Sequence, residues 1–563
     1  MYKFKSQSAT IILFIIGVIF FIIGFNSLAN TNTEQTIKEK EHIKSNLKEH
    51  IEFLADDSLK GRKTGTPEYE LSAQYVARHF NQYGLKPGAE DGTWFQSVPL
   101  IESTLDNGSA QMILHSKSNQ QILKYYEEFF TFPSAISLQD SISAPLIFVG
   151  YGISSKELNH DDYENIDVKG KIIVFINGRP NKFPSEEGAH VSDIREKIKH
   201  AAEHGAVGVI AINSPKSQAY YNLREKSVLP FLKWQNKDES VFDEFPSLKT
   251  VSMITEQAGE KLFLAANKKL SDVYSLIAKQ QIPKAFDLTI EATLKRKSSQ
   301  KRIFSSNIVG VLEGSDPKLK DEYLVISAHL DHIGAEGFKE GTRQEKDYIN
   351  NGALDNASGI AVMLETARRL SEGERPRRSI LFVALTAEEY GLLGSNYFAH
   401  NSPVPISSIV ANVNLDMVAM LYPFADVIAF GAEHSTLKEA INFAAIKNEV
   451  VLTPDPMPEQ AIFVRSDHYS FVKKGIPSIY LMVGLNSKNP KINGAQTFMN
   501  FYGKHYHQPT DDVSLQIDYD AGTVFTNIII DTAKSIANTP LAPSWHKNSF
   551  FGREFKQKAQ GMD

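Results

Sequence analysis

The stretch that decides the fold is YLVISAHLDH, residues 323–332, in which an unbroken apolar run ends in His329 and Asp331. A strand that is apolar along its whole length is typical of a sheet covered on both faces by helices. The same texture recurs in NIVGVLEG (307–314), SILFVALTAEE (379–389), IVANVNLDMV (409–418) and GIPSIYLMV (475–483). Because helical segments alternate with these strands, the chain predicts an α/β domain whose mixed, mostly parallel sheet is sandwiched by helices.

Ionisable side chains follow several of these strands. His329 and Asp331 close the first strand, Glu388 and Glu389 close the next, and Asp416 closes a third. In open α/β sheets, ligands bind at the carboxyl ends of the strands. We therefore expect these side chains to meet at one rim of the sheet.

Two loops add further candidates for the same rim. Asp355 lies in GALDNASG (352–359), before a helix expected near Ile360, and His507 lies in YHQPTD (506–511). Carboxylates gathered without a cation would repel one another and would have to take up protons. Nitrogen and oxygen ligands without thiolate suit zinc, with cobalt or manganese as alternatives. A carboxylate bridging two metal ions is usual in hydrolytic sites of this kind.

Composition excludes several classes of protein. The net charge is -6, from 60 basic and 66 acidic residues, so the chain lacks the basic excess typical of nucleic-acid binding. The absence of cysteine excludes disulfides, thiolate zinc sites and a cysteine nucleophile. The length of 563 residues predicts more than one folding unit.

The N-terminal segment 1–30 is interpreted as a targeting element. Lys3 and Lys5 precede residues 10–25, which carry no charge. This run is long for a signal-peptide core and slightly short for a span of about 20 residues. Ser27-Leu28-Ala29 could serve as a cleavage site. A cleaved signal and a retained anchor both remain open, and either predicts a periplasmic or extracellular protein that meets the membrane only through this segment.

Five short runs in a fixed order carry a resemblance to a known family: HLDH (329–332), NGALDNASG (351–359), LTAEEYGLLGS (385–395), NLDM (414–417) and YHQPTD (506–511). Together they resemble the M28 zinc peptidases, which include secreted bacterial aminopeptidases and glutamate-carboxypeptidase-like enzymes. The resemblance extends to EFLADDSLKGRKTGT (52–66). The middle of the chain is similar to the protease-associated (PA) insert of many members.

The resemblance implies a specific metal cage with two zinc ions per chain. Asp355 would bridge the two ions. His329 and Asp416 would complete one zinc site, and Glu389 and His507 would complete the other. The fold implied is that of the zinc exopeptidases, with a smaller β-rich PA domain inserted.

The resemblance also implies roles around the cage. Glu388 would be the general base that takes a proton from the zinc-activated water and passes it to the leaving amine. Asp331 would orient His329 by accepting its second ring N–H, which is the usual outer-shell arrangement. A cis peptide bond is implied between Asp355 and Asn356.

The function implied is that of a metal-dependent exopeptidase, an aminopeptidase that removes N-terminal residues from peptides. A carboxypeptidase or dipeptidase of the same fold is the first alternative. A glutaminyl cyclase is disfavoured, because those relatives resemble single-zinc enzymes and this chain keeps all five ligand positions. A non-catalytic binding protein on a peptidase fold would have lost ligands, and none is missing here.

The pattern of apolar and polar residues and the family resemblance together predict the domain organisation. The N-terminal part of the peptidase domain is expected over 31–125, the PA insert over 126–290 and the catalytic zinc peptidase domain over 291–540. The basic stretch KRKSSQKR (295–302) is interpreted as a solvated linker. The tail 541–563 has no clear periodicity and could be docked or disordered.

Residues near the motifs receive weaker interpretations. His332 and His505 are expected to be structural or to lie outside the ligand shell. The run RSDHY (465–469) is placed at the rim of the substrate pocket or, alternatively, in a structural loop with an Asp–His hydrogen bond. Tyr502 and Tyr506 could flank the substrate or only pack.

Overall fold

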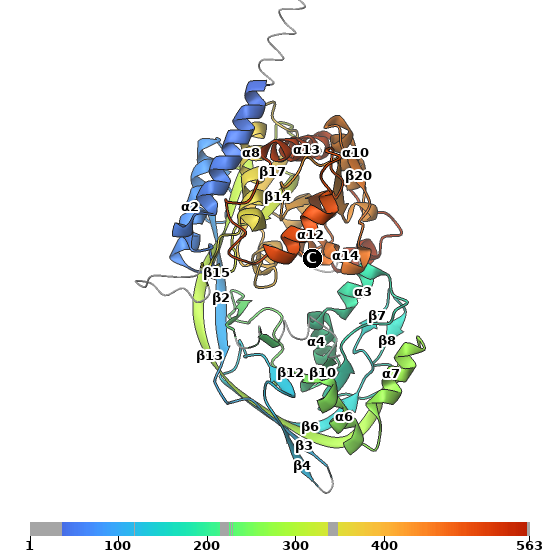
Figure 1. Cartoon of the computed structure of the whole chain (residues 1–563). Helices are drawn as coiled ribbons and strands as arrows, with labels where there is room; N and C mark the ends of the chain where they lie inside the picture. Colours follow the sequence, from blue (N-terminus) through green and yellow to red (C-terminus); the bar gives the residue numbers. More distant parts are fainter. Residues whose placement is uncertain are drawn as a thin grey trace, which may run out of the picture.

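The computed structural model describes residues 37–559, except 117–118, 214–223, 226, 228 and 336–346. The apolar run 10–25, predicted to be a signal or anchor, lies outside the described residues. Among the helices that are described, none is long and apolar enough to cross a bilayer. The molecule has two lobes, an upper one built from both ends of the chain and a lower one built from its middle (Figure 1).

The upper lobe is organised around the predicted sheet. The strands run in the spatial order β13 (Phe286–Leu312), β17 (Ser379–Leu385), β14 (Tyr323–His329), β18 (Ile409–Leu415), β21 (Ser478–Val483), β19 (Asp426–Phe430) and β20 (Val451–Thr453). The four strands from β17 to β21 are mutually parallel, whereas β13 and β19 join antiparallel to their neighbours in that group. The mixed, mostly parallel sheet is confirmed.

Helices cover both faces of this sheet. On one face lie α2 (Pro67–Gln82), α8 (Ser358–Glu372), α10 (Leu437–Lys447) and α13 (Tyr519–Asn538). On the other face, α9 (Leu393–His400) and α11 (His468–Val472) pack through Phe398 and Phe471. Because both faces are dry, the strands need no alternating polar positions, which is why they read as continuous apolar runs.

The N-terminal segment forms two helices against the upper lobe. Residues 37–54 are helical, and Ile43 and Leu54 lie on the buried face of this helix. In α2 the Thr66 hydroxyl accepts the Tyr69 N–H, and a proline occupies the first turn. Leu71 is 52% exposed, because it lies off the buried stripe formed by Tyr69, Ala73, Val76 and Phe80.

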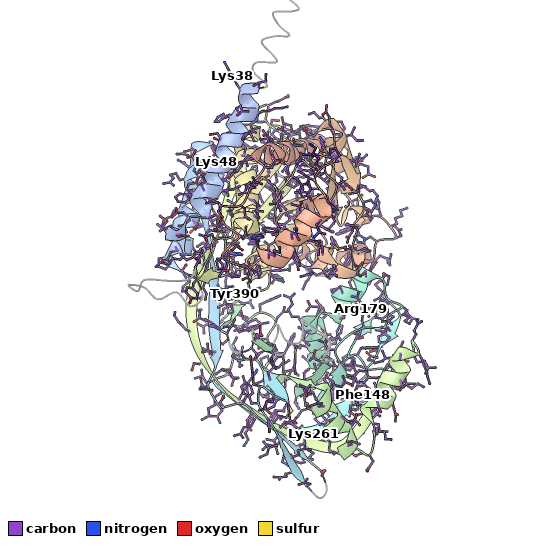
Figure 2. The ribbon with its side chains drawn as sticks, in the orientation of Figure 1. Lys38, Lys48, Phe148, Arg179, Lys261 and Tyr390 are labelled. Atoms are coloured by element: carbon purple, nitrogen blue, oxygen red, sulfur yellow. The ribbon has the colours of Figure 1, made fainter. Side chains whose placement is uncertain are left out.

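The lower lobe has its own, smaller sheet. Its parallel strands are β6 (Gln139–Phe148), β9 (Ile172–Ile176), β10 (Gly208–Asn213) and β12 (Thr250–Thr255), with β5 (Phe129–Thr131) antiparallel at the edge. The helices α4 (Ile194–Glu203), α6 (Glu256–Ala265) and α7 (Leu270–Ala278) surround it. Figure 2 places Phe148 inside this lobe and Tyr390 at the edge of the upper lobe that faces it.

The two lobes share the long strand β13. Its first half pairs with β6 and with β3 (Gln111–His115), and its second half pairs with β2 (Phe95–Leu105) and β17. The prediction that 295–302 is a linker is therefore wrong. Arg296 is buried in this strand and donates to Asp140 at 2.9 Å. Lys295 and Lys297 are exposed and alternate with the buried Arg296 and Ser298, as in a strand with one dry face, whereas residues 299–302 are all exposed.

The C-terminal tail ends in a docked helix, α14 (Phe550–Ala559). Phe550 and Phe551 are buried. Their rings lie beside His190 in α3 (Ser185–Ser192) of the lower lobe, and Phe551 also contacts Phe463 of the upper lobe. The tail therefore packs where the two lobes meet.

Candidate metal centre

The ionisable side chains singled out in the sequence converge on one rim of the upper sheet. His329 is the last residue of β14, Asp416 directly follows β18, and Glu388 and Glu389 follow β17. Asp355 lies in the turn that leads into α8, and His507 follows α12 (Gly494–Lys504). Parallel strands present their carboxyl ends on the same side, which is the reason that residues distant in the chain meet here.

Asp355 stands between two groups of potential ligands. Its Oδ1 lies 3.2 Å from His329 Nε2, which in turn lies 3.2 Å from Asp416 Oδ1. Its Oδ2 lies 3.1 Å from His507 Nε2, which lies 3.2 Å from Glu389 Oε2. One carboxylate thus offers one oxygen to each group, as a bridging ligand requires.

The carboxylates of the site raise the pKa values of two candidate ligand histidines. Burial by itself would lower the pKa of His507. The carboxylates of Asp355 and Glu389 outweigh burial and raise the pKa to about 10. Burial likewise opposes protonation of His329, yet Asp416, Glu388 and Asp355 hold its pKa well above the usual value. Carboxylates that force imidazoles to carry protons are suited to a metal ion, which would supply the positive charge instead. The donor set of imidazole nitrogens and carboxylate oxygens fits zinc.

Glu388 differs from its neighbour Glu389. Burial raises the pKa of the Glu388 carboxyl well above its usual range, and the nearby charges of Asp416 and Glu389 add to this. The pKa of Glu389 is held at about 2, since the imidazoles of His332 and His507 outweigh the effect of burial. One glutamate is thus suited to take up a proton and the other to remain an anion.

Asp331 orients a different partner from the one expected. The ring nitrogen His329 Nδ1 lies 3.0 Å from the backbone carbonyl oxygen of Asp331, whereas the Asp331 carboxylate is 4.0 Å away. That carboxylate instead accepts the backbone N–H of Glu388 at 3.1 Å and the Thr64 hydroxyl at 3.1 Å. The side chain therefore holds the loop that carries Glu388.

Two residues to which no role was assigned from sequence support the site. Asp511 accepts the backbone N–H groups of Leu354 and Asp355, at 2.9 and 3.0 Å, and so fixes the turn around the bridging carboxylate. The peptide bond between Asp355 and Asn356 is cis, as the resemblance implies. Its position in the YHQPTD run was the sign in the sequence that Asp511 could belong to the site.

Arg62 is the second residue that sequence reasoning missed. Its buried guanidinium donates to the carbonyl oxygens of Leu330 at 2.9 Å, Asn351 at 2.6 Å and Gly352 at 3.0 Å, and also to that of Leu54. Burial lowers its pKa to about 10, while the surrounding carboxylates oppose that shift. It remains charged and ties the N-terminal segment to two loops that carry ligands.

The two additional histidines have different surroundings. His505 Nδ1 lies 3.0 Å from the Thr510 hydroxyl, outside the cage, in agreement with a structural role. His332 is fully buried, and its Nδ1 lies 2.8 Å from Glu389 Oε1. Its ring faces that of His507 at 5.5 Å. His332 therefore lies within the candidate metal centre, nearer than expected.

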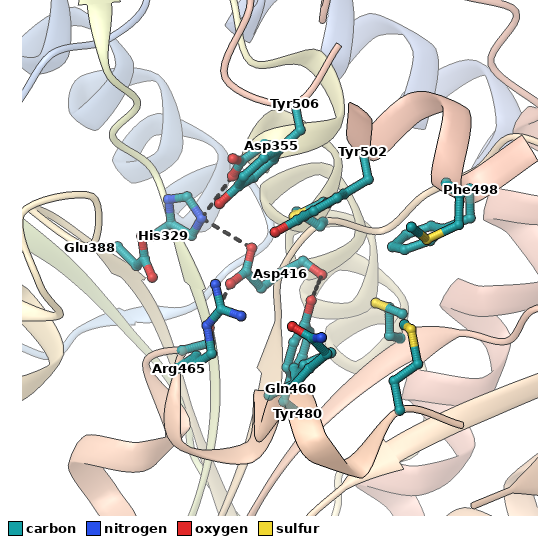
Figure 3. A pocket seen from close by; sticks show the side chains of 16 residues that line it. His329, Asp355, Glu388, Asp416, Gln460, Arg465, Tyr480, Phe498, Tyr502 and Tyr506 are labelled. Carbon is teal, nitrogen blue, oxygen red and sulfur yellow. Dashed lines mark hydrogen bonds and ion pairs between the residues drawn. The ribbon is translucent and has the colours of Figure 1, made fainter. Parts of the chain in front are cut away.

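A cavity of about 220 Å³ opens beside His329, Asp355, Glu388 and Asp416. Much of its remaining wall is apolar and consists of Met417, Met457, Ile462, Met482, Phe498 and Met499. Figure 3 shows Tyr502 and Tyr506 on one side of Asp416, with Arg465 and Gln460 on the other. The rings of Tyr506 and His507 stack at 3.9 Å.

The run 465–469 reaches this cavity from below the sheet rim. Arg465 and Ser466 line the cavity, and the Ser466 hydroxyl donates to Asp416 Oδ2 at 2.6 Å. The alternative of a loop held by an Asp–His hydrogen bond is not what the structure has, because Asp467 and His468 are buried without hydrogen-bond partners. Ser466 thus fixes the outer oxygen of a candidate ligand.

Comparison with known proteins agrees with this architecture. Residues 307–533 match the model of peptidase family M28, and residues 142–262 match the model of the PA domain. The chain is 24% identical over 517 residues to Aminopeptidase YwaD of Bacillus subtilis (strain 168), covering 90% of this chain and 88% of that protein. The upper lobe therefore contains the region similar to peptidase family M28, and the lower lobe contains the region similar to a PA domain.

Two solved structures also align with this chain. An aminopeptidase from Aneurinibacillus sp. strain AM-1 aligns with a TM-score of 0.49 and 20% identity, covering 89% of this chain and 95% of that one. A zinc aminopeptidase from Bacillus subtilis aligns with a TM-score of 0.41 and 21% identity, covering 89% and 96%.

Proposed function

We propose that this chain is a metal-dependent exopeptidase, an aminopeptidase that holds two zinc ions. The observation that carries the proposal is the position of Asp355, whose two oxygens face two separate groups of ligands. His329 and Asp416 would hold one ion, and Glu389 and His507 the other. The sequence relation to a bacterial aminopeptidase over 90% of the chain supports the same activity.

Glu388 would be the general base. It lines the cavity, and burial raises the pKa of its carboxyl, so it can keep a proton after taking it from the attacking water. The proton would then pass from its carboxyl oxygen to the nitrogen of the leaving amine. Bound zinc supplies a Lewis acid that polarises the scissile carbonyl and lowers the pKa of water.

The cavity wall favours an apolar N-terminal side chain. Four methionines, Ile462 and Phe498 line it, and methionine side chains adapt to several apolar shapes. We expect the substrates to be peptides whose first residue is leucine, methionine or phenylalanine. A charged first side chain would lose hydration against the apolar part of this wall.

The experiment is a substrate profile combined with metal analysis. Chromogenic amides of leucine, methionine, phenylalanine, lysine and glutamate are compared with N-blocked peptides that have free C-termini. We expect hydrolysis of the apolar amides, loss of activity with a chelator, recovery with zinc and two zinc ions per chain. Cleavage of N-blocked peptides alone would contradict the aminopeptidase assignment.

A carboxypeptidase or dipeptidase is the second candidate, because of Arg465. Recognition of a free C-terminal carboxylate requires a cation, and this guanidinium lines the cavity. The variant Arg465→Leu separates the two readings. A large rise in KM for substrates with a free carboxylate, with amides unaffected, would favour this second candidate.

We propose further that the protein is exported and acts on peptides outside the cytoplasm. The charged start and the apolar run 10–25 motivate this proposal. Cell fractionation of the full chain beside a form lacking residues 1–30 tests it. Equal recovery of both forms in the cytoplasm would contradict it.

A further inference from the structure

One group of ligands contains a residue that the five-ligand cage leaves out. His332, Asp355, Glu389 and His507 each point a ligand atom into one small space, with all four atoms within 4.8 Å of one another. The other group consists of His329, Asp355 and Asp416. The two halves of the centre are therefore unequal in the number of protein ligands that they offer.

The contact between His332 and Glu389 does not have the geometry of a hydrogen bond. Nδ1 and Oε1 are 2.8 Å apart, yet neither atom has a hydrogen-bond partner. An imidazole N–H is directed along the bisector of its ring angle, so a short contact without a hydrogen bond means that the oxygen lies off that line. Both atoms are directed at a common space more than at each other.

His507 likewise makes short contacts with carboxylates without hydrogen bonds. Its Nε2 lies 3.1 Å from Asp355 and 3.2 Å from Glu389 and makes no hydrogen bond with either. An orienting contact in the same centre looks different, because His329 Nδ1 makes a hydrogen bond with the carbonyl oxygen of Asp331 at 3.0 Å. His332 thus resembles His507, whereas Nε2 of the candidate ligand His329 does make a hydrogen bond, with Asp416 at 3.2 Å.

The ring of His332 is held in place before any ion binds. Its backbone N–H donates to the carbonyl oxygen of Arg62 at 3.3 Å. Gly352 packs against the ring so closely that an added Cβ would lie 2.7 Å from His332 Cδ2. His332 Nε2 is also buried without a partner. A buried imidazole nitrogen without a partner is costly, and coordination of a cation by Nδ1 offsets that cost for this atom.

We infer that His332 is a fourth protein ligand of the ion held by Asp355, Glu389 and His507. This rests on the proposed zinc enzyme and assigns the two ions different tasks. Four protein ligands close a zinc site, whereas three leave a position for water or substrate. The cavity agrees with this division, since His329, Asp355 and Asp416 line it while His332, Glu389 and His507 do not.

The decisive variant is His332→Asn, because the asparagine amide can still donate a hydrogen bond to Glu389 from near the position of Nδ1 but is a poor zinc ligand. His332→Ala removes both capacities, and His505→Ala is the matched control outside the cage. Zinc per chain is measured after dialysis against graded chelator. The visible spectrum of the cobalt-substituted protein reports the coordination number at each site.

We expect His332→Asn and His332→Ala to lose the more tightly held zinc alike, with affinity reduced at least about 100-fold and the cobalt spectrum of that site changed. The control should keep both ions, and metal-free forms of all variants should unfold at similar temperatures. Retention of parental affinity and spectrum by His332→Asn would show that His332 only orients Glu389 and would overturn the inference. A parent chain that binds no zinc would instead contradict the proposed function.

Discussion

The two lobes contain similar sheets that end differently. In the catalytic domain, β14, β17 and β18 lead into His329, Glu388, Glu389 and Asp416, all ionisable. In the lower lobe, β9, β10 and β12 are parallel and buried in the same way. At their ends, Asn177 donates to Asn213 at 2.8 Å, and the Thr255 hydroxyl accepts the Ala258 N–H at 3.2 Å, at the start of α6.

This difference separates architecture from chemistry. A parallel sheet brings the ends of its strands together in both lobes, but among the described residues only the rim of the upper sheet gathers three or more potential metal ligands. At the described strand ends of the lower lobe, polar side chains form hydrogen bonds with each other or cap a helix. We therefore expect substitutions at the first rim to change zinc binding and turnover, and substitutions in the lower lobe to change stability.

The largest effect is expected for Glu388→Gln. The amide keeps the shape of the side chain but cannot accept the proton of water, so turnover of an apolar amide should fall by roughly 10³–10⁴-fold. Zinc content should stay at the parental level. Glu439→Gln, an exposed change on α10, serves as the control. Normal turnover by the zinc-loaded Glu388→Gln enzyme would remove the general-base assignment.

Glu389→Ala is expected to act on zinc binding. Loss of a direct ligand should weaken binding by more than the roughly 10–100-fold that an outer-shell change costs. Competition with a chromophoric chelator measures this loss, and added zinc should restore part of the activity. Thr255→Val at the corresponding end of β12 should leave the zinc affinity unchanged. Equal affinities for these two variants would remove the contrast between the rims.

Asp140→Ala should affect stability alone. It removes the carboxylate that accepts from Arg296 at 2.9 Å and leaves a buried guanidinium without its counter-charge. Such a change costs about 3–5 kcal/mol of unfolding free energy. Thermal or denaturant unfolding measures the loss, and zinc per folded chain should not change. Loss of zinc without loss of stability would contradict the expectation that this lower-lobe substitution leaves zinc binding unchanged.

The smallest effect concerns the junction of the lobes and depends on pH. Burial lowers the pKa of His190 to about 4, and the charge of Lys473 lowers it too. The charges of Glu196, Asp193 and Glu554 partly oppose this shift. The folded-state pKa lies below the unfolded value of about 6.5, so the unfolded chain binds more protons between these values. Stability should therefore fall by about 2–3 kcal/mol as pH drops from about 6.5 to 4.

The comparison variant is His190→Phe, which fits the aromatic surroundings provided by Tyr469 and Phe551 and does not titrate. Unfolding free energies of parent and variant are measured across this pH range. The parent should lose more stability than the variant as pH falls. Parallel curves would show that His190 does not contribute to the acid sensitivity.

Much of this molecule could be predicted from sequence alone. The apolar strands, the helices around residues 43–54 and α2, and the ionisable residues after each strand are local patterns, because burial on both faces and helical periodicity leave a direct trace in the order of residues. The five short runs quoted for the resemblance all lie within residues 307–533, which match the model of peptidase family M28. The basic stretch 295–302 misled, since alternation within a half-buried strand also looks like a charged linker.

The tertiary structure alone decided which groups face each other. Arg62 and Asp511 support the metal centre from segments about 450 residues apart, and no local pattern records a hydrogen bond to a distant backbone group. The position of His332 beside Glu389, and the docking of Phe551 between the lobes, likewise depend on packing across the chain. Sequence determined the kinds of potential ligand, and the fold decided how many of them lie within reach of one another.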